Sequence, residues 1–160
     1  MKKFILCFFA LGSLAFGITD FPALKWGMDP KTVEIFYPHL KKEISIYPGT
    51  EEYSQNDSDS QISKKVFYFQ NDKLVKIDLF YDKTEVTSKD VKNIFNNLRS
   101  KFGNTSKKEP IYEDLGSVKL TGNKLIFPPT PDALVAFKGV DTNQKGKLID
   151  SNLILEYTPR

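Results

Sequence analysis

The chain is poor in the residues that carry most enzymatic chemistry. Cys7 is its only cysteine and His39 its only histidine, and no Gly-x-Gly-x-x-Gly or Gly-x-x-x-x-Gly-Lys phosphate-binding pattern occurs. A Ser–His–Asp triad or a histidine metal centre would therefore depend on His39. No Gly-x-Ser-x-Gly motif accompanies it. The sequence predicts a surface histidine, no catalytic residue, no cofactor and a protein that is not an enzyme.

The first residues carry the signature of export. Met1-Lys2-Lys3 is basic, residues 4–16 are apolar except for Gly12 and Ser13, and small residues permit cleavage after Ala15 or Gly17. Thirteen helical residues reach about 20 Å, whereas a bilayer core of about 30 Å needs roughly 20 residues. We therefore expect a cleaved signal peptide over residues 1–17 and a periplasmic or extracellular product, rather than an uncleaved anchor.

The mature chain of residues 18–160 is expected to form a single domain. Cys7 is preceded by bulky Ile5 and Leu6, unlike a lipid attachment site, and its removal leaves no thiol for a disulfide or a zinc site. Loss of Lys2 and Lys3 from the 23 basic residues leaves 21 against 20 acidic ones. No dense basic run remains, so we expect neither a nucleic-acid partner nor a stable membrane anchor.

Two helices are predicted from their capping signals. Asp29 precedes Pro30, which suits the first helical position, and Pro38 ends that helix. The second helix begins after Thr87, ends at Gly103 and carries one apolar stripe. The stripe comprises Val91, Ile94, Phe95, Leu98 and Phe102.

The remaining segments predict an antiparallel sheet. Strands are expected over residues 43–47, 65–70, 73–81, 116–121, 123–127, 133–137 and 152–157, with turns at 71–72, 122–123, 128–131 and 141–146. The polar stretch 50–65 is expected to be a mobile loop. The order of elements predicts an α+β fold, an antiparallel sheet with two helices packed on one side. Residues 28–33 and 86–91 share a staple-and-cap pattern, which leaves a duplicated helix-plus-strands unit open.

The hairpin around Asn71-Asp72 presents two unlike faces. A two-residue turn would place Phe69 opposite Leu74 and Tyr68 opposite Val75. One face then consists of the core residues Val66, Tyr68, Val75, Ile77, Leu79 and Tyr81. The other carries Phe67, Phe69, Leu74 and Phe80 beside Lys76 and Asp78. These four apolar side chains are either covered by another layer or exposed as an interaction patch. Trp26 either closes the end of the core or stacks on a ligand.

Acidic segments offer two further candidates, and both favour ordinary solvated loops. Asp141-Thr-Asn-Gln-Lys-Gly146 begins like a calcium loop, but Lys145 stands at position five and Asn152 at position twelve. Glu51-Glu52, Asp57 and Asp59 lie in the expected loop, without the opposing walls that paired-carboxylate glycoside chemistry needs. No metal site is predicted.

Three blocks of sequence carry a family resemblance. Leu24-Lys-Trp-Gly-Met-Asp-Pro-Lys-Thr-Val33, residues 66–74 and a helix ending in Leu98-Arg-Ser-Lys-Phe-Gly103 resemble small exported bacterial proteins of uncharacterised function, with a Trp-Gly-Met-x-x-x-x-Val helix start. The Gly27-Met28 start also resembles outer-membrane assembly lipoproteins. Tyr37-Pro38 departs from the Leu-Gly of that family, and no lipobox is present. The order of helices and strands is similar to that of secreted β-lactamase-inhibitor proteins, whose sheets bind a partner enzyme.

These observations favour a non-catalytic exported domain that binds a protein partner in the cell envelope or outside the cell. The expected binding residues are Phe67, Phe69, Leu74, Phe80 and Trp26. The alternative is a module that holds an apolar small ligand between sheet and helix with the same phenylalanines. An enzyme of unrecognised type is the third hypothesis.

Overall fold

The computed structural model describes residues 17–57, 61–105 and 107–160, so almost all of the expected signal peptide lies outside the described residues. The elements follow one another as α1 (Pro30–Phe36), β1 (Lys41–Glu43), β2 (Glu51–Asn56), β3 (Ile62–Gln70), β4 (Lys73–Tyr81), α2 (Ser88–Phe102), β5 (Lys107–Asp114), β6 (Lys119–Ile126), β7 (Ala133–Gln144) and β8 (Lys147–Pro159).

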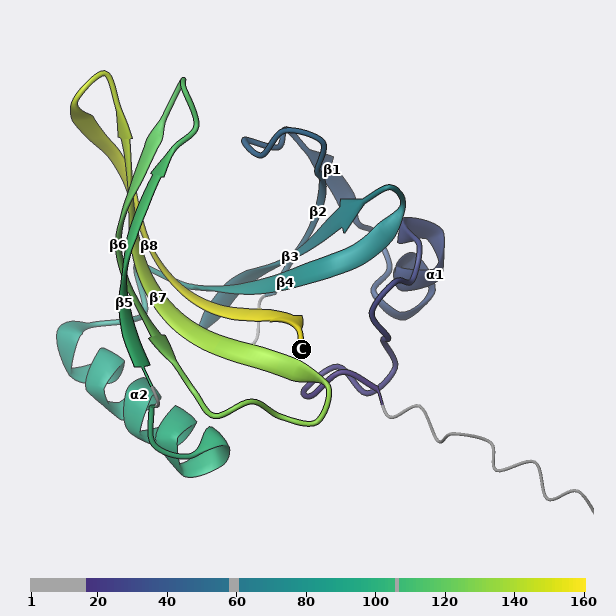
Figure 1. Ribbon diagram of the computed structural model, residues 1–160, viewed down its shortest axis with the longest axis horizontal. Helices are drawn as coiled ribbons and strands as arrows, with labels where there is room; N and C mark the ends of the chain where they lie inside the picture. The colour runs from purple at the N-terminus through teal and green to yellow at the C-terminus, as the bar shows by residue number, and fades with distance from the viewer. Residues whose placement is uncertain (1–16, 58–60, 106) are drawn as a thin grey trace, which may run out of the picture.

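All strands belong to one sheet in the order β1-β2-β3-β4-β8-β7-β6-β5, and every neighbouring pair is antiparallel. Each helix is thus followed by four strands, and the two sets of four meet where β4 pairs with β8. The sheet is strongly curved, with α2 against its outer side and its two ends rising around the inner side (Figure 1). The predicted α+β fold with an antiparallel sheet is confirmed.

The helices begin and end where their local signals predict. Asp29 caps α1 by accepting a hydrogen bond from the Thr32 N–H at 3.1 Å. Thr87 and Asp90 form a capping box at the start of α2, and Gly103, with φ of 93°, ends it. Both helices contribute buried residues to the same core, which places them on one side of the sheet.

The main core fills the convex face of the sheet. Phe67 and Phe69 of β3 are fully buried there, together with Phe127 and Tyr157. The rings pack edge to face or tilted, as in the pair Phe21–Tyr157 at 5.4 Å. Further core residues come from the N-terminal segment, the helices and β7: Ile18, Phe21, Leu24, Val33, Ile94, Leu98, Val135 and Phe137.

A β-bulge corrects the predicted register of the β3–β4 hairpin. Asn71 and Asp72 form the expected turn, with φ of 49° and 58°, and Phe69 lies opposite Leu74 as predicted. Beyond that pair, Tyr68 lies opposite Lys76 and Phe67 opposite Ile77, because Val75 is bulged out of the ladder. The extra residue therefore turns Phe67 and Phe69 toward the main core and Tyr68 toward the opposite face of the sheet.

Several strand boundaries also differ from the prediction. The segment expected as a mobile loop contains β2, whose polar residues are accommodated because β2 pairs with both β1 and β3. The predicted turn at 122–123 lies inside β6, and β5 was not predicted at all. Residues 141–144 continue β7, and Lys145-Gly146 forms a tight turn between β7 and β8. The calcium-like segment is therefore strand and turn. Residues 44–47, predicted as strand, lie beyond the end of β1.

Candidate functional site: a groove on the concave face of the sheet

The concave face of the sheet, opposite the main core, carries a groove of about 480 Å³. Strands β3, β4, β7 and β8 form its floor, and β2, β5, β6 and the segment after β1 form its walls. The lining includes Tyr47, Glu52, Lys64, Tyr68, Asp78, Phe80, Ile111, Tyr112, Glu113, Lys138, Ile149, Asp150 and Glu156. Phe80, predicted from the sequence as a binding residue, is among the lining residues.

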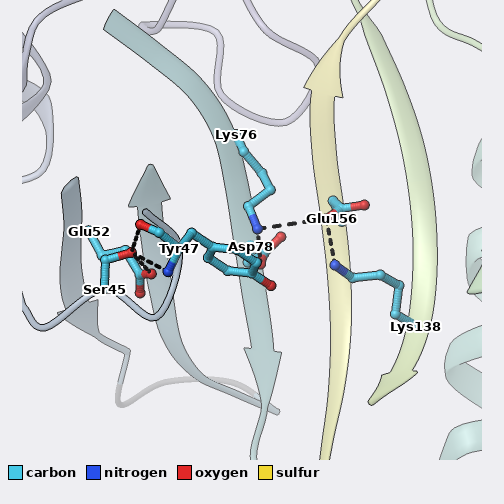
Figure 2. A network of polar contacts seen from close by, with 7 residues as sticks. All are labelled: Ser45, Tyr47, Glu52, Lys76, Asp78, Lys138 and Glu156. Atoms are coloured by element: carbon cyan, nitrogen blue, oxygen red, sulfur yellow. Dashed lines mark hydrogen bonds and ion pairs between the residues drawn. The ribbon is translucent and has the colours of Figure 1, made fainter. Parts of the chain in front are cut away.

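Four charged side chains lie together on the groove floor where β4, β8 and β7 adjoin (Figure 2). Lys138 Nζ lies 2.5 Å from Glu156 Oε2. Lys76 Nζ lies 3.4 Å from Asp78 Oδ2 and 3.9 Å from Glu156 Oε2. Asp78 and Glu156 are direct cross-strand neighbours, so two acidic residues oppose each other and the lysines offset their repulsion.

Two tyrosines enclose the ammonium group of Lys76. Its Nζ lies 3.7 Å from the centre of the Tyr68 ring and 4.8 Å from that of Tyr47. Tyr47 is positioned by Ser45, whose Oγ accepts a hydrogen bond from the Tyr47 N–H at 3.0 Å and donates one to Glu52 Oε1 at 2.6 Å. The segment after β1 thereby holds an aromatic ring over the charged floor, as Figure 2 shows.

Carboxylates on several strands act on the phenol of Tyr47. Burial raises the pKa of its phenol, and four carboxylates raise that pKa further. In decreasing order of effect, these carboxylates belong to Glu113, Asp78, Glu156 and Glu52. Glu52 is on β2 and Glu113 on β5, near opposite ends of the strand order. The curvature of the sheet therefore brings carboxylates from both ends toward one tyrosine.

Three of the same carboxylates act on Lys138. Burial alone would lower the pKa of its ammonium group, yet the pKa is raised because Asp78, Glu156 and Glu113 favour the charged form more strongly. Asp78 itself is 2 % exposed, and its Oδ1 atom has no hydrogen-bond partner within the described ranges. The groove floor thus contains a buried carboxylate oxygen whose polar interactions are incomplete.

Some of the exposed apolar side chains of the protein line the groove. The described residues include eight large apolar side chains that are exposed. Three of them line the groove: Ile46, Tyr112 and Ile149. They come from the segment after β1, from β5 and from the β7–β8 hairpin. We call these three residues the apolar lips.

Burial excludes three predicted binding residues from the protein surface. Phe67 and Phe69 are 0 % exposed and Leu74 is 1 % exposed, all within the main core. The exposed phenylalanine patch considered from the sequence is therefore not formed, because the bulge at Val75 turns the β3 phenylalanines toward the helices. Trp26 is half-buried at the edge of that core, and its Nε1 donates a hydrogen bond to the backbone oxygen of Asp132 at 2.7 Å.

The part of the chain that the structure describes offers no cluster of metal ligands. That part contains no group of three or more His, Cys, Asp or Glu side chains able to hold a metal ion. His39 is exposed in the connector after α1, as predicted for a surface histidine. No helix within the described ranges is both long and apolar enough to cross a membrane.

The groove could have been located only in part from the sequence. Lys76 and Asp78, alternating with aromatic residues on β4, were visible as polar positions on one hairpin face. Lys138, Glu156 and Glu113 gave no such signal, because their partners are on strands distant in the chain.

In comparisons with known proteins, no family model, no curated protein and no solved structure matched the chain.

Proposed function

We propose that this protein is an exported, non-catalytic domain that binds a protein partner in the cell envelope or outside the cell, and that the concave groove receives the partner. The observation that carries this proposal is that the exposed apolar lips line a groove with a charged floor. Exposed apolar side chains that gather in one place mark interaction surfaces far more often than scattered ones do.

The placement of the lips favours a macromolecule over a small ligand. A groove of about 480 Å³ is within the size range of small-ligand sites. A small ligand on its floor, however, would leave much of Tyr112 (70 % exposed) and Ile149 (55 % exposed) in water. Only an occupant of the size of a loop or a domain contacts the segment after β1, β5 and the β7–β8 hairpin together. The likeness to β-lactamase-inhibitor proteins, whose sheets bind an enzyme, agrees by analogy alone.

An apolar ligand between sheet and helix has less support. The phenylalanines expected to hold it pack against other rings, with Phe67 5.0 Å from Tyr37 and Phe69 5.5 Å from Tyr53 between ring centres. The groove lies on the other face of the sheet, and charged groups make up much of its lining.

The experiment places a photo-crosslinking residue at Ile46 or Ile149 in the native host and identifies what it captures by mass spectrometry. Binding of that captured partner to purified protein is then measured for Ile46→Asp and Ile149→Asp. Ile35→Asp serves as the matched control, because Ile35 is exposed on α1, away from the groove. We expect at least tenfold weaker binding for each lip variant, unchanged binding for the control and unchanged folding for all three. Equal binding by the lip variants and the control would refute the groove as the binding surface.

A further inference from the structure

Two carboxylates of the groove have no cation paired with them among the described residues. Five carboxylates line it, from Glu52, Asp78, Glu113, Asp150 and Glu156, against three ammonium groups, from Lys64, Lys124 and Lys138. Lys76 and Lys83 contact Asp78 and Asp150 from beside the groove, so the two kinds of charge are equal in number there. Lys124, however, pairs with Glu109 outside the lining, and Lys64 lies over the Phe80 ring. Charge complementarity at Glu52 and Glu113 therefore favours a positively charged occupant.

Two of these carboxylates remain available to an occupant. Asp150 pairs with Lys83, and Glu156 pairs with Lys138. Glu52 and Glu113 form no ion pair within the described residues, and Glu52 accepts a hydrogen bond only from the Ser45 hydroxyl among the contacts found there. Both line the groove, Glu52 from β2 and Glu113 from β5, and both raise the pKa of Tyr47.

The buried carboxylate of Asp78 provides an independent indication of incomplete polar interactions at the groove. Asp78 lines the groove, its Oδ1 is buried without a hydrogen-bond partner within the described ranges, and Lys76 lies 3.4 Å from Oδ2. Burial and the Asp78 carboxylate raise the pKa of the neighbouring Tyr68 phenol. An unsatisfied buried carboxylate oxygen is costly, and it needs an explanation in a folded protein. A further cation in the groove would stabilise this charge through the low-dielectric surroundings, while Lys76 stays over Tyr68 and Tyr47.

Aromatic rings complete an environment suited to a cationic side chain. Tyr47, Tyr68, Phe80 and Tyr112 line the groove. Lysines of the chain already use two of these rings in addition to Tyr47, with Lys76 Nζ 3.7 Å from the Tyr68 ring centre and Lys64 Nζ 4.6 Å from that of Phe80. Tyr112 is 70 % exposed and has no cation over it among the described residues.

From these observations we infer that the partner inserts a basic side chain, arginine or lysine, into the groove, where its cation pairs with Glu52 and Glu113 and packs against Tyr47 and Tyr112. This inference rests on the proposed function and specifies the chemistry of the partner. A guanidinium group suits the site well, because it pairs with carboxylates and stacks on aromatic rings at the same time.

The test titrates isotopically labelled protein, without residues 1–17, with acetyl-Gly-Arg-Gly-amide and follows the NMR signals of the groove residues. The control peptide carries citrulline, which keeps the shape of arginine without its charge. We expect saturable shifts at Tyr47 and Tyr112 with the arginine peptide and none with the citrulline peptide. Each of Glu52→Gln and Glu113→Gln should weaken binding about fivefold. Glu34→Gln on α1, with the same change in net charge, should leave the affinity unaltered.

The outcomes separate this inference from the proposed function. Equal binding of both peptides, or unchanged affinity in Glu52→Gln and Glu113→Gln, would overturn the basic side chain. The proposed function would still stand if crosslinks from Ile46 and Ile149 reached a partner and the lip variants lost it. Conversely, a captured partner segment that contains arginine or lysine, and whose binding weakens in Glu113→Gln, supports both.

Discussion

Replacement of Phe67 by alanine tests the central feature of the fold, which is the face that β3 turns toward the helices. Phe67 is fully buried, its ring centre lies 5.0 Å from that of Tyr37 and 6.5 Å from that of Phe21, and Ile77 is its cross-strand neighbour. Removing a core phenylalanine costs about 3–5 kcal/mol, from lost burial and from the cavity that remains. We expect about 4 kcal/mol, because the surrounding rings belong to separate segments that cannot all move inward.

Urea denaturation followed by fluorescence of Trp26, the single tryptophan, measures this loss. With a slope of about 2 kcal/mol per molar, the midpoint should fall by about 2 M. Phe80→Ala is the matched control on the groove face, where the half-buried ring should account for only about 1 kcal/mol. Equal losses for the two variants would refute the bulge at Val75, because without it Phe67 would lie on the same face as Lys76.

Two further predictions concern backbone packing and alkaline stability. Gly122→Ala should lower the free energy of unfolding, measured by urea denaturation, by more than about 3 kcal/mol. Gly122 has a φ of 152°, and a Cβ there would lie 2.0 Å from the backbone oxygen of Gly139. The control Gly116→Ala, where a Cβ would have nothing within 4 Å, should cost about 1 kcal/mol. Burial raises the pKa of Tyr81 from 10.0 to about 12, so the unfolded chain loses this proton first as the pH rises. This contribution to stability is therefore complete below about pH 10 and declines toward pH 12. Tyrosine absorbance at 295 nm and thermal unfolding, both followed against pH, should record the decline together. A loss of stability already complete at pH 10 would contradict the prediction.

Elements whose determinants are local were predictable from the sequence. The start of α1 depends on Asp29 and Pro30, and that of α2 on Thr87 and Asp90, all within one turn of the residues that they cap. The Asn71-Asp72 turn also depends on two adjacent residues that tolerate positive φ. Such features need no knowledge of the remainder of the chain, so the helices and the hairpin turn were placed correctly.

The assignment of faces failed because it depends on a distant element. The segment around Val75 is compatible with a regular or a bulged strand, and the choice depends on which β3 face meets the helices. Strand β5 was missed for a related reason. Its sequence, Lys107–Asp114, is mostly exposed and polar and contains Pro110, which an edge strand tolerates and a central strand does not.

The groove was beyond sequence reasoning because its contacts join residues that are far apart in the chain. Lys76 meets Glu156 through the pairing of β4 with β8, and Tyr47 meets the field of Glu113 through the curvature of the sheet. The sequence did indicate that Lys76 and Asp78 occupy a face with aromatic neighbours. It could not indicate that this face is hollow, or which carboxylates line the opposite wall.

The junction of β4 and β8 shows that the two faces of the sheet serve different requirements. On the convex face the cross-strand pairs are apolar, Ile77 with Tyr157 and Leu79 with Leu155. On the concave face the same strands pair Phe80 with Ile154 but place Asp78 directly opposite Glu156, a pairing of like charges that lowers stability unless cations offset it. A junction selected for stability alone would be expected to have an apolar pair at this position as well.

We therefore expect the charged cluster to contribute recognition at some expense of stability. Lys138→Met alone should cost about 2–3 kcal/mol, because it removes the nearest cation of Glu156 and a charge that Asp78 also favours. Replacing all four charges together, with methionine at Lys76 and Lys138 and leucine at Asp78 and Glu156, should instead leave stability unchanged or raise it by about 1–4 kcal/mol. The same fourfold variant should lose affinity for the arginine peptide. If the fourfold variant proved less stable than Lys138→Met, the cluster would be a structural requirement of the junction, and its composition would no longer argue for a binding role.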